Sequence, residues 1–270
     1  MVGFDSHLLN LSNDLTDSKS NFELLTDRII EMGFDSVIYT FYPKPMYNDL
    51  KLQPVLQYSD KCSDFIKYYL EHGYGNHDFV LRLAMSGVLG YIDWVKTADK
   101  IKLTDMEKEV MDVRSSVFGI KNGISFPSFY STFAIAGLAL LSSKDRDEFD
   151  KIKKDNLDEL SDLAKSYHTT VMMTDLKNSF ISPMLAKFNS NKKMVMKFLL
   201  SGQPLKRISE SNNISVNYAE KIVREIRQDF GGVSKSELMY LCGMLNIENY
   251  LYHEQEILSD DKSTQLNPLS

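Results

Sequence analysis

The chain has 270 residues, a formal net charge of −6, and 43% apolar against 25% charged residues. This length exceeds that of a usual single domain, and the composition is that of a globular protein rather than a disordered or fibrous one. No run of about 18 apolar residues indicates a membrane span and no signal peptide opens the sequence, so we expect a cytoplasmic protein without membrane contact. Cys62 and Cys242 lie far apart in the sequence and support neither a disulfide framework nor a cysteine-based metal site.

The first part of the chain mixes helical and strand-like patterns. Apolar spacing predicts an amphipathic helix over residues 22–32, and branched and aromatic residues predict strands at 36–43 and 54–59. Helical spacing then returns in three segments, residues 64–72, 78–85 and 104–118. The last of these begins with Thr104 and has Glu107 three residues later, which is the pattern of a capping box.

Two more strand-like runs follow, at residues 123–130 and 132–142. Only Ser131 separates them, which is too short for a crossover, so we expect an antiparallel hairpin whose turn uses neighbouring residues. Helices clustered between pairs of strands favour an antiparallel sheet with helices packed on its faces. The expected fold class is therefore α+β, with an N-terminal α/β/α sandwich.

Residues from 147 onward predict a long amphipathic helix. Its apolar residues recur at helical spacing, and they are Phe149, Ile152, Leu157, Leu160, Leu163, Tyr167 and Val171. Packing of this face against the helix's own sheet is one interpretation, and pairing with the same helix of a second copy is the other. Residues 177–190, which contain Pro183, are then expected to form a linker.

Residues 202–238 predict two short helices joined by a tight polar turn. The first helix is expected to open at Pro204, where a missing N–H costs nothing, and to end at the polar residues 211–213. Ile214 fills the turn, and Ser215 is a suitable N-cap for the second helix. This arrangement is typical of DNA-binding domains that place their second helix in the major groove.

The second helix of this pair has two different faces. The apolar face, expected to be core, consists of Ala219, Ile222, Val223, Ile226 and Phe230. The residues expected to bind DNA, on the opposite face and at the helix start, are Asn217, Tyr218, Lys221, Arg224 and Gln228. Residues 187–238 contain ten Lys and Arg against five Asp and Glu, a local net charge of +5. A small helical hairpin with a solvated basic face is the plainer interpretation.

Helices are also expected at residues 191–201 and from Ser234 onward, which gives four helices around one small core. This all-α helix-turn-helix arrangement resembles the DNA-binding domain of LuxR-type transcription factors over roughly residues 188–245. The positions that carry the resemblance are Gly202, Ile208, Ile214, Ser215, Phe230 and residues 233–238.

The N-terminal part resembles the ligand-sensing domain of LuxR-type quorum-sensing regulators. Tyr69, Asp78 nine positions later, and Trp94 occur in the order and near the spacing that this family uses. Gly119, Gly123 and Pro127 match the family's glycines and proline at the beginning of a strand. The resemblance implies a sensing domain at residues 1–176, a linker at 177–190, a DNA-binding domain with a C-terminal extension at 191–258, and a polar tail at 259–270.

The ligand of such a domain, an acyl homoserine lactone, has one N–H donor, two carbonyl acceptors and an apolar tail. Its buried site therefore needs an acceptor, two donors and an apolar channel. We expect Asp78 to accept the amide N–H, Tyr58 to donate to the acyl carbonyl, and Tyr69 and Trp94 to form aromatic walls. In the plainer interpretation Asp78 only caps the helix that follows it, and the aromatic residues are ordinary core.

The sequence departs from the family pattern at several positions. Phe65, a predicted pocket residue, stands where the family usually has a tryptophan, and it has no N–H to bond the lactone carbonyl. That bond is missing or comes from elsewhere. Phe79 replaces a proline, no polar residue stands out in residues 133–141, and Lys192 replaces an acidic residue of the DNA-binding part. A ligand other than a standard lactone and an altered DNA preference are therefore left open.

No enzyme motif is present in the sequence. The five histidines show no metal-ligand spacing beyond a loose pair, His72 and His77, and neither a glycine-rich phosphate loop nor a nucleophile elbow occurs. The resemblance implies instead a transcriptional regulator that responds to a small-molecule signal, needs no cofactor and binds a two-fold symmetric DNA site as a homodimer. RNA polymerase is a further candidate partner. The alternative is an interaction protein that has lost its signal response and acts by pairing with another regulator.

Overall fold

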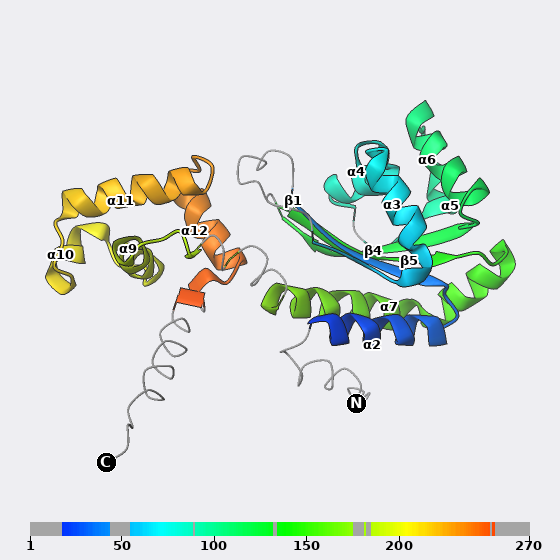
Figure 1. Cartoon of the computed structure of the whole chain (residues 1–270), viewed down its shortest axis with the longest axis horizontal. Helices are drawn as coiled ribbons and strands as arrows, with labels where there is room; N and C mark the ends of the chain where they lie inside the picture. Colours follow the sequence, from blue (N-terminus) through cyan, green and yellow to red (C-terminus); the bar gives the residue numbers. More distant parts are fainter. Residues whose placement is uncertain are drawn as a thin grey trace, which may run out of the picture. The chain divides into compact units, whose positions relative to one another are not determined.

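The computed structural model of the chain describes residues 18–43, 55–88, 90–131, 134–174, 181, 185–248 and 250–251. These residues belong to two compact units, which divide between Thr174 and Asp175. We call the part up to Thr174 unit 1 and the part from Ile181 onward unit 2 (Figure 1).

A five-stranded antiparallel sheet, counted over the described residues, is the centre of unit 1, with the strand order β2-β1-β5-β4-β3. The strands are β1 (Ser36–Pro43), β2 (Val55–Tyr58), β3 (Ile92–Asp93), β4 (Asn122–Tyr130) and β5 (Ala134–Ser142). β4 and β5 form the predicted antiparallel hairpin, in which Asn122 lies opposite Ser142. The register shifts between Pro127 and Phe129, at a residue whose nitrogen cannot donate to the ladder.

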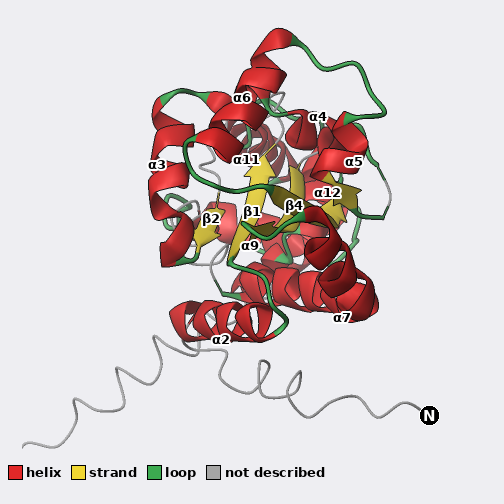
Figure 2. Ribbon diagram, turned by 90° about the vertical axis from the view of Figure 1, so that its right-hand side faces the viewer, coloured by secondary structure: helices red, strands yellow, loops and turns green. Residues whose placement is uncertain are grey.

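Helices cover both faces of this sheet, which confirms the predicted α/β/α sandwich (Figures 1 and 2). One layer consists of α2 (Ser18–Glu31) and α7 (Arg146–Met173). The opposite layer consists of α3 (Ser63–Glu71), α4 (Phe79–Met85), α5 (Trp94–Ala98) and α6 (Asp105–Ser116), with a 3-10 turn at Tyr74–His77 between α3 and α4. The capping box predicted at Thr104 and Glu107 opens α6.

The apolar face of α7 packs against its own sheet. Phe149, Leu160 and Val171 are fully buried, and the ring of Tyr167 lies edge-on to that of Tyr39 with the centroids 5.1 Å apart. Each large apolar side chain buried in this way contributes about 1.5–3 kcal/mol. The first of the two sequence interpretations of this helix therefore holds, because the face that could have paired with a second copy is already used.

Unit 2 is helical in its described residues. Its elements are α9 (Ser190–Leu200), a 3-10 turn (Leu205–Arg207) that runs into α10 (Ile208–Ser211), α11 (Val216–Asp229) and α12 (Lys235–Met244). The side chain of Ser215 accepts the N–H of Tyr218, so the predicted N-cap opens α11. The predicted apolar face of α11, from Ala219 to Phe230, is buried. The C-terminal part is thus the all-α half of the α+β chain.

Candidate functional site

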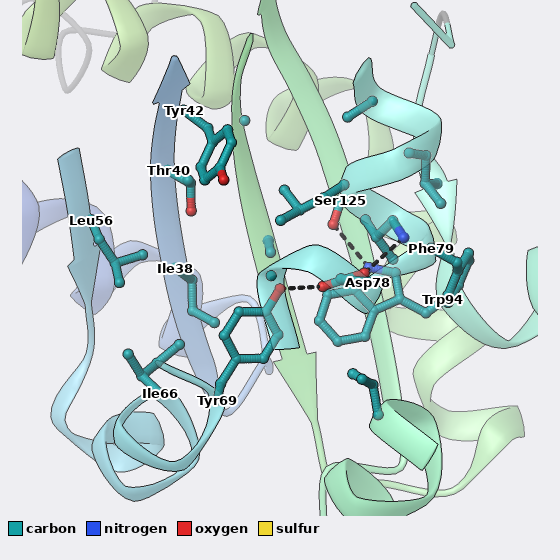
Figure 3. A pocket seen from close by; sticks show the side chains of 18 of the residues that line it. Ile38, Thr40, Tyr42, Leu56, Ile66, Tyr69, Asp78, Phe79, Trp94 and Ser125 are labelled. Carbon is teal, nitrogen blue, oxygen red and sulfur yellow. Dashed lines mark hydrogen bonds between the residues drawn. The ribbon is translucent and has the colours of Figure 1, made fainter. Parts of the chain in front are cut away.

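A cavity of about 300 Å³ lies in unit 1 between the sheet and the helices α3, α4 and α6. Most of its wall is apolar, formed by side chains such as Ile38, Leu56, Phe65, Ile66, Phe79 and Val80. Figure 3 shows a few polar side chains among the apolar ones, with Thr40, Tyr42 and Ser125 on the strands and Tyr69 and Asp78 on the helical side. A largely apolar space with a small number of fixed polar groups is the usual form of a small-molecule site.

Asp78 and Tyr69 form the central polar pair of this cavity (Figure 3). The hydroxyl of Tyr69, on α3, donates to Asp78 Oδ2 at 2.8 Å. The other carboxyl oxygen accepts the N–H of Val80 at 2.7 Å, which makes Asp78 the N-cap of α4. The two sequence interpretations of Asp78 are therefore not exclusive, because one side chain caps a helix and lines the cavity.

Burial controls the ionisation of this pair. It raises the pKa of Asp78, against the hydrogen bonds from the Tyr69 hydroxyl and from backbone N–H groups, which lower it. Burial, together with the negative charge of Asp78, raises the pKa of Tyr69 well above its ordinary value. Tyr69 is consequently a neutral hydroxyl donor at physiological pH, and Asp78 is an acceptor held at a fixed position.

Trp94 forms another wall, and both its backbone and its indole ring are held in place. It is the first residue of α5, whose N-cap Asp93 accepts hydrogen bonds from Arg146 at 2.6 Å and from Lys153 at 2.5 Å. The indole N–H of Trp94 donates to Ser125 Oγ on β4 at 2.8 Å.

Gly123 on β4 makes room for the Trp94 ring. A Cβ atom added at Gly123 would lie 2.4 Å from Cε3 of Trp94, closer than any real Cβ contact. Only a glycine at this position therefore lets the indole lie flat against the strand. This gives a steric reason for the glycine that the sequence comparison singled out.

The structure brings together four of the five predicted ligand-binding residues. Phe65, Tyr69, Asp78 and Trp94 all line the cavity. Tyr58 does not, because it ends the outer strand β2, where it is 38% exposed. The β2 residue in the cavity wall is Leu56, two positions earlier on the same face.

Several polar lining residues were missed by the sequence analysis. Thr40 and Tyr42 come from alternate positions of β1, and Ser125 comes from β4. Arg114 of α6 also lines the cavity and is only 3% exposed. It follows the buried Val110 by four residues, so a charged residue on the inner face of a predicted helix was the available signal.

The side chains predicted to bind DNA all lie at the surface of unit 2. Asn217, Tyr218, Lys221, Arg224 and Gln228 are exposed along α11. Lys192, which replaces an acidic residue of the family pattern, forms an ion pair with Asp229 at the end of α11, at 2.7 Å. This lysine thus joins α9 to α11.

Two other kinds of site are not seen in the part of the chain that the structure describes. No group of three or more His, Cys, Asp or Glu side chains among these residues is placed to hold a metal ion. None of the described helices is long and apolar enough to cross a membrane.

Comparison with known proteins gives the family of the chain. The family model of the autoinducer-binding domain matches residues 18–171. The crystal structure of Escherichia coli SdiA is similar, with a TM-score of 0.58 at 12% identity over 90% of this chain and 96% of SdiA. A structure of SdiA in complex with octanoyl-rac-glycerol gives a TM-score of 0.53 at 13% identity, over 88% and 92% of the two chains. No curated protein matches the chain in sequence. Because the matched domain spans more than half of the 270 residues, the chain belongs to the family of proteins with the autoinducer-binding domain.

Proposed function

We propose that this protein is a DNA-binding transcriptional regulator whose activity depends on a small amphiphilic signal bound in the cavity of unit 1. The observation that carries the proposal is the apolar cavity with the fixed Tyr69–Asp78 pair inside an autoinducer-binding domain. The same chain supplies, in α11, an exposed helix face with donors suited to DNA. Signal and DNA would then act on two units of one cytoplasmic protein.

The cavity fits a ligand with an acyl tail and a compact polar head. The apolar walls match the tail, and Asp78 supplies a buried acceptor for an amide N–H or a hydroxyl. SdiA, which is similar in structure, is seen in complex with octanoyl-rac-glycerol. This acylglycerol is an amphiphile of the same kind. Acyl homoserine lactones and acylglycerols are therefore the first classes to test.

The DNA-binding part of the proposal rests on α11. Lys221 and Arg224 are exposed cations on the face opposite the core, and Asn217 and Gln228 extend that face with amide groups. Arginine, lysine and amide side chains bind base edges and phosphates when such a helix lies in the major groove. A dimer would place two copies of α11 about one helical turn of DNA apart and so read a two-fold symmetric site.

Thermal melts and DNA binding by the full chain test this function together. We expect one or more acylated signals to raise the melting temperature. At a hundredfold excess over Kd, a ligand that binds only the folded protein adds about 2.7 kcal/mol to its free energy of unfolding. The liganded protein should bind a duplex selected from a random pool. Arg224→Ala should weaken that binding by ~1–3 kcal/mol without lowering the melting temperature. Lys165→Ala, which removes an exposed lysine of unit 1, is the matched control.

Three outcomes would each contradict a different part of the proposal. DNA binding without any ligand that changes the melting temperature would favour a regulator that acts independently of a signal. Neither ligand nor DNA binding, in a folded protein, would favour the interaction protein that acts by pairing with another regulator. Unchanged DNA affinity in Arg224→Ala and in Lys221→Ala would place the DNA-reading surface outside α11.

A further inference from the structure

Arg114 is a buried cation in the wall of the cavity, and no described residue forms a hydrogen bond with it. Its side chain comes from α6 and is 3% exposed. Nε and Nη1 are buried and have no hydrogen-bond acceptor among the described residues. The guanidinium carbon lies 4.8 Å from the centre of the Trp94 ring, so a cation–π contact holds the group in place.

The surroundings of Arg114 do not satisfy this cation. Asp78 is the negative charge that acts on it through space, but the oxygens of Asp78 already accept from the Tyr69 hydroxyl and the N–H of Val80. Burial lowers the pKa of Arg114 to about 10, against the favourable charge of Asp78, and the group still carries its proton at neutral pH. A buried charge with unmet donors is costly unless a partner supplies acceptors.

Nothing in the described part of the chain gives a structural reason for the unmet donors of Arg114. Among the residues that the structure describes, Arg114 joins no two elements through hydrogen bonds, whereas the buried Lys153 donates to both Asp93 and Asp150. The unmet donors of Arg114 lie in the wall of the one space that the proposed function assigns to a ligand. The partner that would complete Arg114 is therefore the ligand itself.

We propose that Arg114 binds the carboxylate head group of the ligand, so that the cavity prefers acidic amphiphiles, such as acylated amino acids, over neutral lactones. This proposal rests on the proposed function and names its ligand class. A guanidinium presents donors in pairs that match the two oxygens of a carboxylate, and an anion also compensates its charge, which a neutral carbonyl does not. Phe65, which cannot donate to a lactone carbonyl, fits the same preference.

Asp78 can remain in the site beside such a ligand. Burial already raises the pKa of Asp78, so the approach of a second carboxylate favours its protonated form further. In either form Asp78 keeps an oxygen that can accept from an amide N–H of the ligand. The carboxylate of an acylated amino acid would then bind Arg114, and its amide N–H would donate to Asp78.

A lactone and its own ring-opened acid provide the sharpest test, because the two probes share the acyl chain and amide. Trp94 is the single tryptophan of the chain and lines the cavity, so its fluorescence reports binding of either probe. In titrations with N-octanoyl homoserine lactone and N-octanoyl homoserine, the full chain should bind the acid more tightly. Arg114→Met should weaken binding of the acid by about tenfold or more and change lactone binding much less.

Two further variants separate head-group binding from folding. Arg114→Lys keeps the charge but not the paired donors, and should bind the acid with an affinity between the wild type and Arg114→Met. Arg28→Met removes an exposed arginine of the same unit and should change neither affinity. Arg114→Met loses the cation–π contact with Trp94 but no hydrogen bond to a described residue, and it removes a buried charge with unmet donors. The unliganded variant should therefore melt close to the wild type.

The outcomes are distinguishable. Tighter binding of the lactone by the wild type overturns the carboxylate preference and leaves the proposed function standing. Equal loss of acid binding in Arg114→Met and Arg28→Met would also overturn it. Binding of neither probe, nor of any acylated signal in the thermal melts, would overturn the proposed function as well.

Discussion

At the scale of single residues, Asp78 shows how one carboxyl group serves both the fold and the site. It caps α4 through the N–H of Val80 and receives the Tyr69 hydroxyl on its other oxygen. A cap of this kind is worth about 1 kcal/mol, and a buried hydrogen bond to a ligand is of similar size. Stability and ligand affinity must therefore be measured side by side.

Substitution of Asp78 should separate these two contributions. Asparagine is an equally good cap, so Asp78→Asn should change stability little, whereas Asp78→Ala should cost about 1 kcal/mol. Both should weaken binding of an amide-containing ligand by ~1–3 kcal/mol, because the buried N–H loses its carboxyl acceptor. Ligand titrations and thermal melts of the two variants measure this. If both keep wild-type affinity, Asp78 belongs to the helix cap alone.

At the scale of elements, His168 joins α7 to the sheet. Its Nδ1 lies 2.8 Å from the hydroxyl of Tyr39 on β1, and its ring stacks on Phe129 of β4 with the centroids 4.9 Å apart. Burial lowers the pKa of His168 to about 4. The folded protein therefore holds this histidine neutral where the unfolded chain would bind a proton.

The contact between α7 and the sheet should consequently weaken in acid. The pKa of His168 is about 6.5 in the unfolded chain and about 4 in the folded protein. Stability is therefore fully present above pH 6.5 and is lost as the pH falls towards 4, because the unfolded chain then binds a proton that the folded protein does not. Denaturant unfolding should show a loss of about 3 kcal/mol across this window. His168→Phe keeps an aromatic ring but cannot titrate, so its stability should be flatter there. Identical pH profiles would show that His168 has the same pKa in the folded and the unfolded chain.

Most elements could be predicted from the sequence because their patterns are long or their caps are local. β1 has the predicted bounds, and α2, α6 and α11 begin within a few residues of the predicted positions. The short helix α5 was not predicted, since five residues are too few for helical periodicity.

The candidate site was predictable only in part. Tyr69, Asp78 and Trp94 were found through order and spacing, and they do line the cavity. Tyr58 was also expected in the cavity, but it does not line it. It lies at the exposed end of an edge strand, and this depends on the order of the strands in the sheet, which the sequence does not show. Arg114 was missed because a single cation within a helical pattern resembles a surface residue until the packing of the helix is known.

At the scale of the whole molecule, two units with separate cores lie on one chain of 31.0 kDa. One copy of α11 can contact only one half of a symmetric DNA site. We therefore expect sedimentation of the liganded protein to give twice the mass of one chain. A two-fold symmetric duplex should bind more tightly than a duplex with one half-site. Equal affinity for both duplexes, with one chain bound to each, would contradict a dimeric regulator.

The contact of Trp94 with Gly123 has a consequence for the evolution of the family. Because any side chain at position 123 would overlap the indole, the two positions cannot change independently. Among relatives that keep a large aromatic residue at the position of Trp94, glycine should be retained opposite it even where the head-group residues have diverged. Loss of that aromatic residue should come before, or together with, the appearance of a larger residue in the strand. This steric pair would then trace shared descent across members whose signals differ.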